Sequence, residues 1–428
     1  MTVTRIAAND RIVQLDVLRG IAILFILFMN IQHMGDFSNP DYAPNRVSWT
    51  GFDQAAWWVN RILDGTQRGL LELLFGAGVL IMARNAMTPD GPVEVADLHM
   101  RRNMWLMVFG VAHGVMLLWE GDILLAYGTA ALLVFPFRLL DPRKLLGIGI
   151  AINLALAAPS VIDYAERVAL VSAVGAAQTR QAAHEPPTAD DKRALSQWKK
   201  AVAEARGPDP KWIAAEQAKM HGPFSTYAAG RINTWAFVQF TGIGIYWTCV
   251  VEALGTMLIG MALFKWGIIQ GKSRRSTAVM MLVLGYGIGV ALRIPATIAQ
   301  LRFDALPDPG WVTFELARLP IVFGHIGAVT LALSTDLGRK LLKPFEANGR
   351  LPLSTYMGAS AAAIVLFGWP FLGLFGRFGF GTLFLIASGV IVAQIIIANL
   401  WLKAFATGPL EWLWKSLSYA KLQPFRRP

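Results

Sequence analysis

Residues 14–35 read QLDVLRGIAILFILFMNIQHMG, and the apolar run in this stretch decides the class of fold. A helix rises about 1.5 Å per residue, so about 20 apolar residues cross the roughly 30 Å hydrocarbon core of a bilayer. Asp16 and Arg19 stand at the start of the run, where they break the pattern of a cleavable signal peptide. The stretch therefore predicts a membrane-spanning helix that the mature protein keeps.

The composition of the whole chain agrees with this prediction. Of the 428 residues, 55% are hydrophobic and 16% are charged, whereas about 25% are charged in soluble domains. The single Cys249 excludes an internal disulfide. The formal net charge of +11 is explained by the Lys and Arg that membrane proteins gather in cytoplasmic loops, so no nucleic-acid partner is expected.

Similar apolar runs recur along the sequence, about ten in number. They lie near 14–35, 67–86, 103–121, 122–140, 144–164, 240–268, 277–300, 311–335, 352–375 and 379–405. We therefore predict an all-α, polytopic integral membrane protein with a helical extramembrane loop insertion. Its expected regions are 1–164 with the first five membrane helices, 165–231 as a periplasmic helical loop or cap, 232–405 with five more, and 406–428 as a basic cytoplasmic tail.

The predicted topology places both termini in the cytoplasm, because Lys and Arg gather in the loops on that side. The 165–231 insertion then lies on the outer side. It is rich in alanine, with helix stops at Pro186-Pro187 and an N-cap candidate at Thr188. A cap over the outer mouth and a mobile loop without a role remain equal alternatives.

Ionisable groups inside a bilayer are candidates for function, because burying them is costly. Asp16 and Arg19 share a helix face and can pair, and Arg19 could instead hold a phosphate at the inner leaflet. Asn30, His113 and His325 are expected near mid-depth, where they are packing residues or the lining of a cavity.

A further layer of charged residues is expected towards the outer side: Glu72, Glu120, Asp122, Glu252, Arg293, Glu315 and Arg318. Glu252 needs a cationic partner, for which Arg293 or Arg318 is available. This layer consists either of structural ion pairs or of the polar wall of an acceptor site. The six histidines show no metal-ligand spacing, so no metal is expected.

Several motifs, in order along nearly the whole chain, resemble those of the YeiB-like family of bacterial integral membrane proteins of unknown function. They are LDVLRGIA (15–22), LFGAG (74–78), His113-Gly114, GDIL (121–124) with Tyr127, GRLPLSTY (349–356) and GPLEWLW (408–414). That family is similar to membrane acyltransferases that modify O-antigen or glucan, and to heparan-alpha-glucosaminide N-acetyltransferase. The resemblance implies a multi-pass protein of the bacterial inner membrane, with both termini cytoplasmic.

The resemblance also implies a chemistry and a set of residues. Acyl-CoA is the expected donor, docked against the substrate-binding residues Asp16, Arg19, Arg101, Arg102, Arg293, Arg350, Thr355 and Tyr356. The acyltransferases place an intramembrane histidine where this chain has Asn30, so the imidazole must come from His33 or, as we favour, His113. Asp122 or Glu252 would orient His113, and Asn30 would donate a hydrogen bond to an oxyanion.

The leading hypothesis is therefore an acyltransferase-like membrane protein that moves an acyl group from cytosolic acyl-CoA to an envelope sugar, lipid or small metabolite. A transporter with a pathway of buried Asp, Glu, His and Arg is the main alternative, and a non-catalytic membrane scaffold is a third. Membrane lipids are expected partners, and a homo-oligomer is possible. A continuous tunnel from Arg19 past His113 would favour transfer, whereas a central cavity between two related halves would favour transport.

Overall fold

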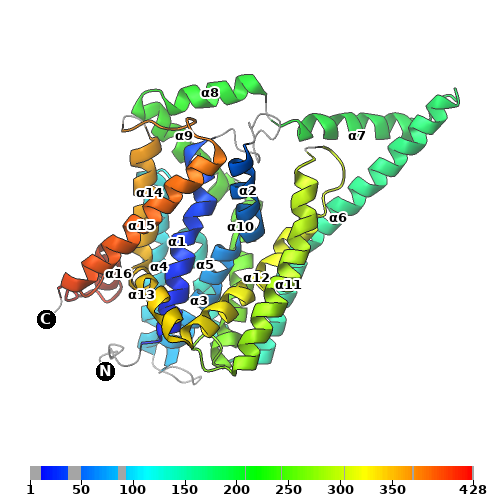
Figure 1. Ribbon diagram of the computed structural model, residues 1–428. Helices are drawn as coiled ribbons and strands as arrows, with labels where there is room; N and C mark the ends of the chain where they lie inside the picture. Colours follow the sequence, from blue (N-terminus) through cyan, green and yellow to red (C-terminus); the bar gives the residue numbers. More distant parts are fainter. Residues whose placement is uncertain are drawn as a thin grey trace.

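The structure is a computed structural model that describes residues 11–36, 50–84, 93–207, 209–241, 243–302, 304–368 and 371–426. Within these ranges the chain is helical and contains no strand, apart from one isolated bridge between Phe405 and Arg426. Most helices run side by side in one bundle, and α8 lies across one end of it (Figure 1). The predicted all-α class is confirmed.

The helices of the bundle and of its insertion follow one another along the chain. They are α1 (Val13–Gly35), α2 (Gly51–Leu63), α3 (Thr66–Ala83), α4 (Val93–Met116), α5 (Leu124–Val134), α6 (Pro142–Ala182), α7 (Ala189–Ala205), α8 (Pro210–Met220), α9 (Phe224–Ala236), α10 (Ile243–Lys265), α11 (Arg275–Gln300), α12 (Gly310–Leu333), α13 (Asp336–Arg350), α14 (Pro352–Phe367), α15 (Phe380–Ala404) and α16 (Pro409–Ser418). Short helical segments extend α5 to Leu139 and α9 to Thr241.

Seven spans among the described residues are long and apolar enough to cross a membrane, and one of them consists of α2 and α3 together. The bent pair α13 and α14 makes an eighth if it counts as one span. The expected number of about ten is therefore not confirmed. The difference arises near 103–121, where α4 carries charges in its first turns, and near 122–140, where the apolar helix is short. The other candidate spans still indicate a polytopic membrane protein.

The insertion begins inside a helix rather than at a loop. Since α6 continues for 41 residues, the expected boundary at 164/165 falls in its middle. The predicted stop at Pro186-Pro187 and the N-cap at Thr188 are confirmed, because α6 ends at Ala182 and the Thr188 side chain accepts from Asp191 N. The insertion then returns through α7 and α8 to the end of the bundle opposite α13 and α16 (Figure 1).

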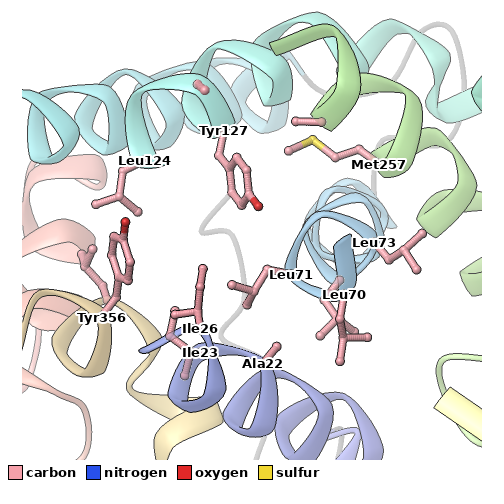
Figure 2. Packing of buried hydrophobic residues seen from close by; sticks show 14 of the residues in the cluster. Ala22, Ile23, Ile26, Leu70, Leu71, Leu73, Leu124, Tyr127, Met257 and Tyr356 are labelled. Atoms are coloured by element: carbon pink, nitrogen blue, oxygen red, sulfur yellow. The ribbon is translucent and has the colours of Figure 1, made fainter. Parts of the chain in front are cut away.

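The core packs tightly because glycines let backbones approach. A Cβ at Gly76 would lie 2.0 Å from the carbonyl oxygen of Met257, and one at Gly349 would lie 1.8 Å from that of Asp16. Helices α3 and α10, and α1 and α13, therefore cross almost backbone to backbone. Apolar side chains of α1, α3, α5 and α10 fill the space between the helices (Figure 2).

Candidate functional site

Three buried polar side chains form a chain of hydrogen bonds between α4, α5 and α14. His113 Nδ1 lies 2.8 Å from Asp122 Oδ1, and His113 Nε2 lies 2.8 Å from Ser360 Oγ. All three residues are buried, and the side chains of His113 and Asp122 are fully inaccessible. With its proton on Nδ1, the imidazole donates to Asp122 and accepts from the Ser360 hydroxyl. We call Asp122, His113 and Ser360 the relay.

Local structure holds each member of the relay in place. Asp122 precedes α5, and its second oxygen accepts from Leu125 N at 3.0 Å, as a residue before a helix commonly does. A Cβ at Gly110 would lie 2.6 Å from this carboxylate, and one at Gly114 would lie 2.2 Å from Trp235. The glycines that flank His113 in sequence therefore admit close neighbours, as predicted.

The relay borders a small cavity beneath α9. The cavity measures about 10 Å³, room for about one water molecule, and Ser360 lines it together with Met34, Trp119, Tyr227 and Arg231. Arg231 pairs with Glu120 at 3.0 Å. The insertion therefore supplies part of the wall of this cavity.

A second polar cluster, which we call the ion network, connects α3, α10 and α12. Arg318 Nη1 lies 2.9 Å from Glu72 and 2.6 Å from Glu252, and its Nε lies 3.1 Å from Glu315. Arg68 adds a second cation, 3.0 Å from Glu252. Of the two expected partners of Glu252, the structure selects Arg318. Of the two carboxylates expected to orient His113, it selects Asp122.

Neutral groups complete the ion network. The Tyr127 hydroxyl lies 3.3 Å from Glu72 Oε1 and 3.2 Å from the Arg68 carbonyl oxygen, and Arg318 Nη2 donates to Asn153 at 3.2 Å. Tyr127 follows Asp122 by five residues, so one stretch of chain carries members of both clusters. In Figure 2, Tyr127 and Leu124 both point from α5 into the same apolar interior.

Several expected substrate-binding residues lie apart from the relay. Arg19 pairs with Asp16 at 3.4 Å and donates to the Gly349 carbonyl oxygen at 3.1 Å, so it joins α1 to α13. The Arg102 guanidinium stacks on Trp414 of α16, 4.3 Å from the ring centroid. Arg101 pairs with Asp97 at the surface.

Three further expected residues, Arg293, Thr355 and Tyr356, make separate contacts within the bundle. Arg293 donates to the carbonyl oxygens of Arg61 and Asp64 at 2.7 Å, which braces the turn between α2 and α3. Thr355 accepts from Asn348 at 3.2 Å, while Tyr356 packs edge-on against His113 with ring centroids 4.8 Å apart. Tyr356 is therefore the expected binding residue that reaches the relay.

The structure also places His325, His33 and Asn30, the other polar groups that the sequence singles out. His325 lies 2.8 Å from the Tyr286 hydroxyl and 3.2 Å from Thr66 Oγ1. These contacts agree with a packing residue, one of the two roles considered for His325. His33 is in the last turn of α1, and Asn30 is half-buried one turn earlier on the same helix. The described residues include no group of three His, Cys, Asp or Glu side chains that could hold a metal.

Sequence reasoning missed Ser360, Arg68 and Arg231. Ser360 stands in Gly358-Ala359-Ser360-Ala361, a small-residue pattern that usually indicates helix packing. Its position directly after the GRLPLSTY motif was the available signal. Only its hydrogen bond to His113 of α4 distinguishes it from an ordinary small residue.

Comparison with known proteins supports the expected family. Residues 263–421 match the family model described as Protein of unknown function (DUF418). The chain is 26% identical to the uncharacterized protein YxaH of Bacillus subtilis over 98% of this chain and 97% of that protein. It is 28% identical to the uncharacterized protein YeiB of Escherichia coli over 97% and 98%. The YeiB-like resemblance is thus confirmed, and no solved structure matches the chain.

Proposed function

We propose that this protein is a membrane acyltransferase and that the relay is its catalytic centre. The observation that carries the proposal is the hydrogen-bonded order carboxylate, imidazole, hydroxyl, with both imidazole contacts at 2.8 Å. The same order activates the serine nucleophile in unrelated hydrolases and acyl-transfer enzymes. Asp122 would fix the tautomer of His113, and His113 would take the proton of Ser360.

In this proposal the acyl group passes through an ester on Ser360. The hydroxyl oxygen attacks the thioester carbonyl of acyl-CoA, the C–S bond breaks, and the proton held on His113 Nε2 leaves with the CoA thiolate as a thiol. An acceptor hydroxyl then attacks the acyl-serine, gives its proton to His113, and restores the Ser360 hydroxyl. No further co-reactant is needed.

The surroundings of the relay set one condition on this chemistry. A cavity of about 10 Å³ has no room for an acyl group, so substrate entry requires displacement of α9, which carries Tyr227 and Arg231. We place the donor on the cytoplasmic side of a bacterial inner membrane and the acceptor, an envelope sugar, lipid or small metabolite, on the side of the insertion. Asn30 keeps its role as a possible oxyanion donor only if that displacement brings it to Ser360.

The test uses the full-length protein in inverted vesicles, whose cytoplasmic face points outward. Radiolabelled acetyl-CoA is added outside, and a hydrolysate of envelope lipid and sugar is enclosed inside. Wild-type protein is expected to become labelled on Ser360 and to release labelled product. Ser360→Ala and His113→Ala should abolish both signals, because each removes a member of the relay. Asp122→Asn should slow transfer by about 10⁴-fold, as loss of the orienting carboxylate does in serine proteases.

Ser388 offers a matched control, because its hydroxyl donates to the Phe384 carbonyl oxygen of its own helix α15. Ser388→Ala should keep full labelling and turnover. Undiminished labelling of Ser360→Ala would overturn the proposed nucleophile, and undiminished turnover of His113→Ala would overturn the proposed base.

Transport is a second candidate, favoured by the ion network. Two guanidiniums and three carboxylates lie within one membrane interior, a pattern that marks ion and proton pathways. This candidate predicts proton flux that depends on Glu72 and persists in Ser360→Ala. Flux measured with a pH-sensitive dye in vesicles therefore separates the two candidates.

A further inference from the structure

A cavity away from both the relay and the ion network lies among the described residues. It is a cleft of about 710 Å³ at the end of the bundle where α1 begins, α12 ends and α13 crosses. The charged groups that line it are four cations and one carboxylate: Arg275, Arg339, Lys340, Lys343 and Glu346. Arg339 also pairs with Asp336 at 2.5 Å. The cleft therefore has a positive balance that favours an anionic ligand.

The helix that borders the cleft has the form of an interfacial helix. Helix α13 meets α14 at 86°, so it turns sharply away from the direction of its neighbour. Leu337 and Leu341, one turn apart on α13, are 68% and 64% exposed, while Lys340 and Lys343 lie on another face. A helix of this kind lies in the membrane interface, with leucines among acyl chains and lysines near phosphates.

The cleft also holds polar groups that suit a hydroxylated headgroup. Gln270 Oε1 is a buried acceptor that has no hydrogen-bond partner among the described residues, and Gln270 lines the cleft. The hydroxyls of Ser273 and Ser334 line it as well. A buried acceptor without a partner is costly, so a ligand hydroxyl that donates to it would be stabilised.

We propose that this cleft binds the headgroup of an anionic phospholipid, such as phosphatidylglycerol. Arg275, Lys340 and Lys343 surround the phosphate, and Gln270 accepts from a headgroup hydroxyl. The acyl chains lie against the exposed leucines of α13. The exposed leucines favour a lipid over a soluble phosphate, because a soluble ligand would leave them uncovered. The site is independent of the acyltransferase proposal.

The test is native mass spectrometry of the purified full-length protein in neutral detergent, titrated with phosphatidylglycerol, phosphatidylcholine or glycerol 3-phosphate. Wild-type protein should bind phosphatidylglycerol at least tenfold more tightly than either of the others. The triple variant Arg275→Gln, Lys340→Gln, Lys343→Gln should bind it about 100-fold more weakly, since each basic residue near a lipid surface contributes about fivefold. Equal affinity for phosphatidylcholine would overturn the charge assignment.

A matched triple variant on α7, Lys192→Gln, Lys199→Gln, Lys200→Gln, changes the net charge equally but lies outside the cleft. It should retain wild-type affinity, and an equal loss in both triple variants would overturn the site. The double variant Leu337→Ser, Leu341→Ser should bind phosphatidylglycerol more weakly and should bind glycerol 3-phosphate with unchanged affinity. Equally tight binding of glycerol 3-phosphate and phosphatidylglycerol would overturn the assignment of a lipid and indicate a soluble phosphate ligand instead.

Discussion

Replacing Arg318 with methionine is expected to destabilise the protein more than any single change at its surface. The guanidinium is 2% exposed and lies within 3.1 Å of three carboxylates, of which Glu72 is 1% exposed. Methionine fills much of the same volume but leaves Glu72 without its close cation. Arg68, the other cation, is 3.9 Å from Glu72 and remains mainly with Glu252.

The magnitude follows from the one carboxylate that loses its partner. Removing one member of a buried ion pair typically costs about 3–5 kcal/mol, because the remaining charge stays buried. We therefore expect Arg318→Met to lower the free energy of unfolding by about 4 kcal/mol. The measurement is denaturant titration in mixed micelles, followed by tryptophan fluorescence.

Two further variants make the result decisive. Arg302→Met removes a half-exposed arginine that pairs with Asp304, and it should cost less than about 1 kcal/mol. Adding Glu72→Gln to Arg318→Met should recover more than half of the loss, because the unpaired charge is then absent. A cost below about 1 kcal/mol for Arg318→Met, or no recovery in the double variant, would refute the reasoning.

Three other predictions concern helix crossing and the insertion. Gly349→Val should lower the free energy of unfolding by about 3 kcal/mol or prevent folding, because the new Cβ meets a carbonyl oxygen of α1. Gly287→Val should be tolerated, because Gly287 has open space around it. The yield of monodisperse protein in size-exclusion chromatography measures both outcomes. Thr188→Ala should destabilise α7 by about 1 kcal/mol, seen as faster amide exchange there alone. The hydrogen bonds from Arg180 and Thr188 lower the pKa of Asp191, so the stabilisation that they give is present above the ordinary pKa of an aspartate and is lost as the pH falls. Pepsin should therefore cleave near α7 faster as the pH is lowered from about 4 to about 2. Asp191→Asn should remove this pH dependence.

The spans were largely predictable, because a bilayer imposes a length and an apolar composition on each helix. The runs near 277–300 and 379–405 correspond to α11 and α15 within a few residues. The end of α6 was not predictable in the same way. Polar residues after 162 indicate where the chain leaves the apolar layer, but the alanine-rich sequence that follows continues the helix. The residue where the chain leaves the apolar layer and the residue where the helix ends are therefore set by different properties of the sequence.

The relay was only partly predictable. His113 and Asp122 are nine residues apart on either side of a tight turn, so their contact is local and the sequence could suggest it. Ser360 is 247 residues from His113, and no periodicity specifies which helices become neighbours. For the same reason the sequence left Asp122 and Glu252 as alternatives for orienting His113. The structure pairs Glu252 with Arg318 and Arg68, which come from two other helices.

The separation of the two clusters allows activity and stability to be tested independently. The ion network ties α3, α10 and α12 together with five charged groups, so changes in it disturb the bundle itself. Ser360 contributes one hydroxyl and a hydrogen bond to the His113 imidazole, which is worth about 1 kcal/mol. A Ser360→Ala protein should therefore fold nearly as well as the wild type. Any loss of acyl transfer in that variant can then be assigned to the missing hydroxyl, whereas a loss in an Arg318 variant cannot.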